Sequence, residues 1–251
     1  MNAPLVIAGI TVAGGLVGLG SGWLAVALEK VEKLEEEERQ ERLEYERDVA
    51  EARITAEAAG EEPPAPRAWI GERYGWTWLE RWLSPALGAA GFGAFAAHED
   101  FGSGLLIQLL WIAIFVHVVN FDLKHKLILN VITYPSILAA LVLSTWSPRL
   151  TLTSAIIGAV GVAAFFFVQN LVSRGSIGLG DAKLGALVGA VTGAGPTSTH
   201  LGAVYAVIAG VFIGGATALV LLVTRIRGLK DPIPYGPFLC AGAALILYLG
   251  P

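Results

Sequence analysis

The chain has 251 residues, of which 55% are hydrophobic and only 15% are charged. Its mean hydropathy is +0.64, which excludes an ordinary soluble domain, because such a domain carries far more charge. The net charge of −4 averages over unlike parts of the chain and does not indicate nucleic-acid binding. The one cysteine, Cys240, excludes an intrachain disulfide and a cysteine-built zinc site, and its apolar surroundings predict an inert buried thiol.

The first apolar run, at 3–28, could be mistaken for a secretory signal peptide. No basic segment precedes it, and it is longer than the about 7–15 residues of a signal-peptide core. We therefore expect a retained transmembrane helix with an external amino terminus.

Most of the charge lies in the next segment, 29–83. Residues 29–62 are rich in helix formers with opposite charges four positions apart, so they predict a solvated helix that continues the first span. The prolines of 61–68 predict a linker. Five aromatic residues within 69–84 suit the headgroup region of a bilayer.

Seven further apolar segments follow, so the sequence predicts about eight transmembrane helices. The fold class is therefore an all-α, polytopic membrane helix bundle with a charged cytoplasmic helical insert. We divide the chain into a first transmembrane helix (1–28), the cytoplasmic insert (29–83) and a seven-helix membrane core (84–251). The seven segments of the core, of which the first and fifth are short, are 84–97, 104–121, 129–146, 151–172, 179–194, 199–224 and 235–250.

Lysine and arginine positions predict the orientation of these spans. With the amino terminus external, eight spans leave 16 of the 17 basic residues in cytoplasmic segments and only Arg149 outside. An odd number of spans would put several basic loops outside, so the charges support eight spans independently of hydropathy.

Two acidic residues lie at similar depth on the predicted cytoplasmic side. Asp122 ends the span at 104–121, and Asp181 opens the span at 179–194. An ionisable group in a span is costly and by default indicates function. Each residue alone has a structural alternative, because Asp122 precedes a basic stretch and Asp181 could cap its helix. Their shared depth favours one site that contains both.

Two neighbouring carboxyl groups do not easily both ionise, so they share one proton. The ionised member can take a proton from water while the protonated member polarises a peptide carbonyl, which is the chemistry of aspartic peptidases. Gly178 and Gly180 would let an extended peptide approach the backbone closely. We therefore expect an enzyme that uses no cofactor and no metal.

The segment GLGDAKLGALVGA, which contains Asp181, resembles the GxGD signature of the type IV prepilin peptidases, in which a lysine follows two residues later. The stretch VNFDLKHKLILNVITYP (119–135) resembles the first-aspartate region of this family, and IPYGPFLCAGA (233–243) resembles its closing segment. The resemblance covers about residues 84–251. It implies that Asp122 and Asp181 are the catalytic pair, supported by Gly178, Gly180, Lys183, Lys124 and Asn130.

This resemblance implies a membrane-embedded aspartic endopeptidase of the bacterial inner membrane. Its substrate would be a type IV prepilin or a type II secretion pseudopilin, with a basic leader in the cytoplasm and a hydrophobic helix in the bilayer. The family's bifunctional members carry paired cysteines that bind zinc, and this chain has none. Leu129 also stands where a proline is common. The sequence therefore favours peptidase activity and weighs against an N-methyltransferase.

Two other functions fit the same aspartates. A related GxGD peptidase would act on signal peptides or other membrane substrates. A proton-coupled transporter would use the pair as a relay, although transporter sites usually lie near mid-bilayer, whereas these residues lie toward one face.

Overall fold

The computed structural model describes residues 3–31, 34–59, 75–148, 150–173, 178–194, 201–224 and 233–250. Within these ranges every regular element is a helix, as the composition predicts. One short element, η1, is a π-helix that leads directly into α3. The elements are α1 (Pro4–Val31), α2 (Leu34–Ala59), η1 (Leu79–Leu83), α3 (Ser84–His98), α4 (Ser103–His125), α5 (Asn130–Ser144), α6 (Leu152–Val172), α7 (Leu179–Thr192), α8 (Gly202–Val223) and α9 (Gly236–Leu249).

Each predicted span corresponds to one helix of the bundle, which confirms the all-α polytopic fold class. Among the described residues, α1, α4, α6 and α8 are long and apolar enough to cross a membrane. The other four have 14 or 15 residues and are about 21–23 Å long, less than the about 30 Å of a hydrocarbon core. The sequence predicts that α3 and α7 are short. α5 is three residues shorter than its predicted segment (129–146), and α9 is two residues shorter than its own (235–250).

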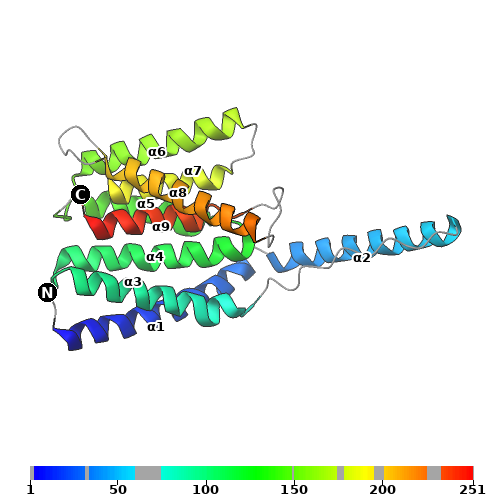
Figure 1. The fold of residues 1–251 in the computed structure, drawn as a ribbon, viewed down its shortest axis with the longest axis horizontal. Coiled ribbons are helices and arrows are strands. Elements are labelled where there is room, and N and C mark those ends of the chain that lie inside the picture. The colour runs from blue at the N-terminus through cyan, green and yellow to red at the C-terminus, as the bar shows by residue number, and fades with distance from the viewer. Residues whose placement is uncertain are drawn as a thin grey trace.

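Figure 1 shows a bundle of roughly aligned helices with both chain termini at one end and α2 extending away from the other. Termini at one end are expected for an even number of spans. The described side chains of α2 are mostly exposed, as predicted for a solvated helix. The proline linker predicted at 61–68 lies outside the described residues.

Helices pack in pairs around two inner helices. α1 lies mainly against α3, α6 against α7, and α8 against α9, while α4 and α7 contact helices on several sides. α4 and α7 are also extensively buried, and each carries one of the two candidate catalytic aspartates. Both aspartates are therefore carried by helices that lie inside the bundle.

Glycines bring the helix backbones into direct contact, as expected where apolar burial gives no driving force for association in lipid. A Cβ atom at Gly189 of α7 would lie 2.1 Å from the carbonyl oxygen of Gly158 in α6. A Cβ atom at Gly158 would lie 2.2 Å from the carbonyl oxygen of Gly189. Since backbone atoms cannot move aside as a side chain can, α6 and α7 require glycine at both positions.

We predict that Gly189→Val lowers the free energy of unfolding by at least about 2 kcal/mol, because the added side chain separates α6 from α7. Gly161→Val in α6 is the matched control, since a Cβ atom there would meet nothing within 4 Å. Its effect should stay within about 0.5 kcal/mol. Thermal unfolding in detergent measures both variants, and equal midpoints would contradict the assignment of this contact.

Candidate active site

The two candidate aspartates lie at the same end of the bundle, the end from which α2 extends (Figure 1). Asp122 is in the last turn of α4, which continues to His125, so Asp122 lies inside the helix. The helix ends where Lys126 adopts a left-handed conformation (φ 55°) and donates its amide to the Asp122 carbonyl at 2.8 Å. Asp181 is in the first turn of α7.

The first residue of α9 holds the Asp122 carboxylate. The Gly236 amide donates a hydrogen bond to Asp122 Oδ2 at 2.9 Å, at a helix amino end, where the dipole favours negative charge. A Cβ atom on Gly236 would lie 2.5 Å from that same oxygen. Asp122 is buried, so its side chain has little room to move away. Glycine at 236 is therefore needed for this contact.

Asp181 lies close enough to Asp122 for their carboxyl groups to interact electrostatically. It also interacts with the backbone of Gly178, the residue before α7, as in one half of a capping box. Asp181 therefore interacts with the start of its own helix and with Asp122, so the two interpretations of this residue are compatible. Tyr235, the residue before α9, lies near Asp181 as well.

Gly178 and Gly180, which precede Asp181, could each hold a side-chain carbon without a clash. A Cβ atom at Gly178 would meet only Asp181 Oδ2 at 3.7 Å and the Gly180 amide nitrogen at 3.8 Å. A Cβ atom at Gly180 would meet Ile128 at 3.4 Å. These are ordinary contact distances, so packing within the chain does not require either glycine.

Two predicted supporting residues meet on the surface of the site. Lys183 Nζ donates a hydrogen bond to Asn130 Oδ1 at 2.7 Å and lies 5.7 Å from the centre of the Tyr134 ring. This contact joins the first turn of α5 to α7. It holds the segment that follows Asp122 against the helix that carries Asp181.

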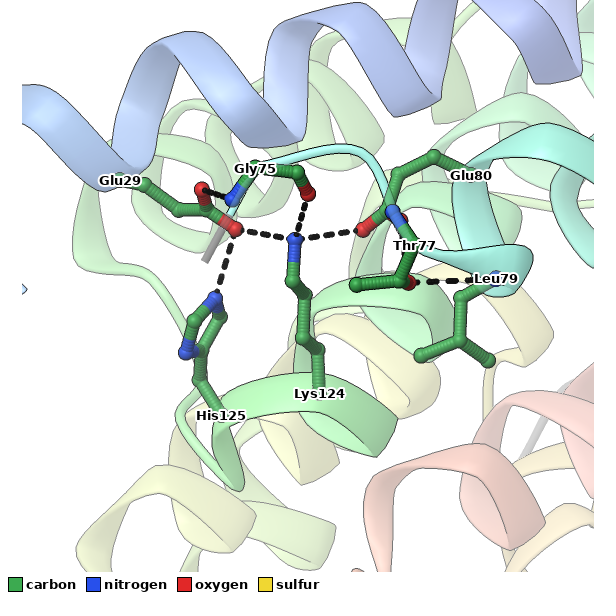
Figure 2. A network of polar contacts seen from close by, with 7 residues as sticks. All are labelled: Glu29, Gly75, Thr77, Leu79, Glu80, Lys124 and His125. Carbon is green, nitrogen blue, oxygen red and sulfur yellow. Dashed lines mark hydrogen bonds and ion pairs between the residues drawn. The ribbon is translucent and has the colours of Figure 1, made fainter. Parts of the chain in front are cut away.

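Lys124, the remaining supporting residue, points elsewhere. Its ammonium group contacts Glu29, Glu80 and the carbonyl of Gly75, and His125 contacts the same Glu29 oxygen as Lys124 (Figure 2). Lys124 is thus part of a buried ion-pair network and not of the aspartate pair.

Two further residues, His117 and Cys240, are not members of the aspartate pair. His117 is buried in α4 and shares a hydrogen bond with Ser21 of α1 at 3.3 Å, as a core histidine does. Cys240 is buried in α9, which confirms the burial predicted for this thiol, and it lies near enough to Asp122 to interact with it electrostatically. In the described part of the chain, no three His, Cys, Asp or Glu side chains gather to hold a metal ion.

Sequence reasoning did not identify Gly236, Glu29 or Glu80 as residues of interest. The dipeptide Gly-Pro at the start of an apolar helix was the available signal for Gly236, because that position places a free amide beside the preceding turn. Glu29 and Glu80 stood in a segment full of acids and arginines, so nothing in the sequence separated them from solvated charges.

The structure is thus a membrane helix bundle in which the ends of two inner helices, α4 and α7, bring two aspartates near each other. Residues 107–220 match the family described as "Type IV leader peptidase family". This part of the chain, which contains Asp122 and Asp181, is therefore similar to that family, in agreement with its motifs.

The curated proteins that match this chain have names that agree with the family match. Two proteins from Burkholderia pseudomallei, strains 1026b and K96243, each called "Prepilin leader peptidase/N-methyltransferase", are 32% identical over 177 residues. The match covers 66% of this chain and 53% of each relative, so the chain spans about half the length of the curated relatives it matches. No solved structure matches the chain significantly.

We predict that Gly236→Ala displaces Asp122 and loosens the start of α9. Cys240 lies one helical turn further along α9, so it reports on this movement. Its modification by a small thiol reagent should become several-fold faster than in the unchanged protein. Gly215→Ala in α8 is the control, because a Cβ atom there meets nothing within 4 Å. Identical modification rates in the two variants would contradict the predicted displacement.

Proposed function

We propose that the chain is an aspartic endopeptidase that cleaves the leader from a type IV prepilin or pseudopilin at the cytoplasmic side of the bacterial inner membrane. The observation that carries this proposal is the proximity of Asp122 and Asp181, which are 59 positions apart in the sequence. The family match and the printed names of the relatives support the same reaction.

The pair can perform peptide hydrolysis with one proton shared between the two carboxyl groups. The ionised aspartate accepts a proton from water as the water oxygen attacks the peptide carbonyl carbon. The protonated aspartate donates a hydrogen bond to the carbonyl oxygen, on which negative charge develops. The amine then leaves with a proton, and the pair returns to its starting state. The Gly236 amide holds Asp122 in one orientation during these steps.

The surroundings of the pair suit a substrate that enters from the membrane surface. Gly178 is exposed and unobstructed by neighbouring side chains, so an extended peptide can lie along the backbone next to Asp181. A prepilin presents its cleavage junction where a basic leader meets a hydrophobic helix, which is the depth at which the positive-inside rule places the two aspartates.

Two alternatives make different predictions. A GxGD peptidase of another specificity would need the same aspartates but would cleave a substrate without a prepilin-type leader. A proton-coupled transporter would show substrate flux that depends on pH and no proteolysis. Location of both aspartates at one end of the bundle favours a peptidase over a relay near mid-bilayer.

We predict that Asp122→Asn and Asp181→Asn each lower prepilin cleavage by about 10²–10⁴-fold or more, because an amide cannot transfer the proton. Purified protein and a candidate prepilin are incubated together, and mass spectrometry locates the cut. Asp48→Asn, which changes an exposed residue of α2, is the matched control and should cleave normally. Full activity in either active-site variant would refute the peptidase assignment.

We also predict that the mature product keeps an unmodified amino terminus when the methyl donor S-adenosylmethionine is present, because the chain lacks the paired cysteines of the bifunctional proteins. The mass of the cleaved product measures this directly. A mass increase corresponding to one methyl group would show instead that methyl transfer does not depend on that zinc-binding insert.

A further inference from the structure

Lys124 lies at the centre of a buried polar network at the base of the charged insert (Figure 2). Its ammonium group is 2.5 Å from Glu29 Oε1 and 2.9 Å from Glu80 Oε1, and it donates a hydrogen bond to the Gly75 carbonyl. The Lys124 side chain is only 2% exposed, and both glutamate side chains are fully buried. We call these residues, with Thr77 and His125, the Lys124 network.

Three of the four carboxylate oxygens in the Lys124 network accept hydrogen bonds, and the fourth, Glu80 Oε1, has only its ion pair with Lys124. Glu29 Oε2 accepts the Gly75 amide at 3.0 Å, and Glu29 Oε1 also accepts from His125 Nε2 at 2.9 Å. Glu80 Oε2 accepts the Thr77 amide and hydroxyl. Burial alone would raise the pKa of the Glu80 carboxyl, but hydrogen bonds from Thr77 and Lys124 bring it below its ordinary value. Buried charges that are paired and hydrogen-bonded in this way favour one geometry.

The network ties together three segments that are distant in the sequence. Glu29 lies at the end of α1, Gly75 and Glu80 lie where the chain returns from the insert, and Lys124 lies in the last turn of α4. The hydrogen bond between Glu29 and Gly75 closes the base of the insert. The segment that leads into α3 is therefore fixed to the same turn of α4 that carries Asp122.

Asp122 and Lys124 lie on opposite faces of that turn. Residues two apart on a helix are separated by about 200° of rotation, so the Lys124 side chain faces α1 and η1 while Asp122 faces Gly236 and α7. Phe121 and Leu129 add an apolar contact to Ala25 and Leu28 of α1. The position of Asp122 is thus set from one side by Gly236 and from the other by the Lys124 network.

We propose that Lys124, Glu29 and Glu80 are positioning residues for the peptidase reaction, which fix the last turn of α4 so that Asp122 meets Asp181. The expected effect on kcat rests on the proposed function. The inference that these residues fix the last turn of α4 does not depend on that function. Lys124→Met removes the cation while keeping a side chain of similar length, and it leaves two buried carboxylates without their partner. The turn then shifts, and the separation of the two aspartates changes.

The test uses the full chain in detergent at a temperature well below its unfolding midpoint. Lys124→Met should lower kcat for prepilin cleavage by about 100-fold, as expected when reacting groups are misplaced by about 1 Å, with little change in KM. Modification of Cys240 should become several-fold faster, because this thiol lies one helical turn from Gly236, which donates a hydrogen bond to Asp122. Lys30→Met, which removes an exposed lysine adjacent to Glu29, is the matched control and should change neither quantity.

The proposal is overturned if Lys124→Met and Lys30→Met give the same kcat and the same Cys240 rate, even where Lys124→Met lowers the unfolding midpoint. If Lys124→Met yields no folded protein, Glu80→Gln replaces it, because the amide keeps the shape and one acceptor oxygen. A smaller decrease in kcat with faster Cys240 modification then supports the proposal, and wild-type values for both overturn it. If the unchanged protein cleaves no prepilin, the proposed function fails, while the Cys240 rates still decide whether the network positions Asp122.

Discussion

The last turn of α4 carries two buried charges of opposite sign that project in opposite directions. Asp122 accepts a backbone amide from the start of α9, and Lys124 lies between two buried glutamates at the base of the insert. Burying a single charge in an apolar bundle is costly unless it is paired. Each charge therefore requires its own set of partners, and these partners fix where the helices of this end of the bundle must lie.

Close backbone packing makes this arrangement possible. Gly158 and Gly189 let α6 and α7 approach until their backbones touch, and Gly236 lets α9 approach Asp122 without a side chain between them. Gly178 and Gly180 differ from these, because a Cβ atom at either would meet the described residues only at ordinary contact distances. Two kinds of glycine are thus present: one kind assembles the helices, and the other leaves the backbone beside Asp181 accessible.

Much of the fold could be predicted from the sequence, because a bilayer imposes simple rules on hydropathy and on the distribution of basic residues. The same rules placed Asp122 and Asp181 at one depth, and the GLGD motif singled out Asp181. The short length of α5 could not be predicted, since Leu129 and Trp146 continue the hydropathy signal past the helix ends. Glu29 and Glu80 could not be distinguished either, because their burial depends on contacts with Lys124, more than 40 residues away from each.

The Lys124 network gives the charged insert a mechanical connection to the site that its composition does not suggest. α2 extends away from the bundle (Figure 1), so its own side chains do not reach the aspartates. The two ends of the insert, however, are joined by the Glu29–Gly75 hydrogen bond and held by Lys124. The contact between the insert and the turn that carries Asp122 is therefore made by Glu29, Gly75 and Glu80 and not by the extended part of α2. The bundle needs the two ends of the insert to be joined to each other and to Lys124, which lies two residues after Asp122 in α4.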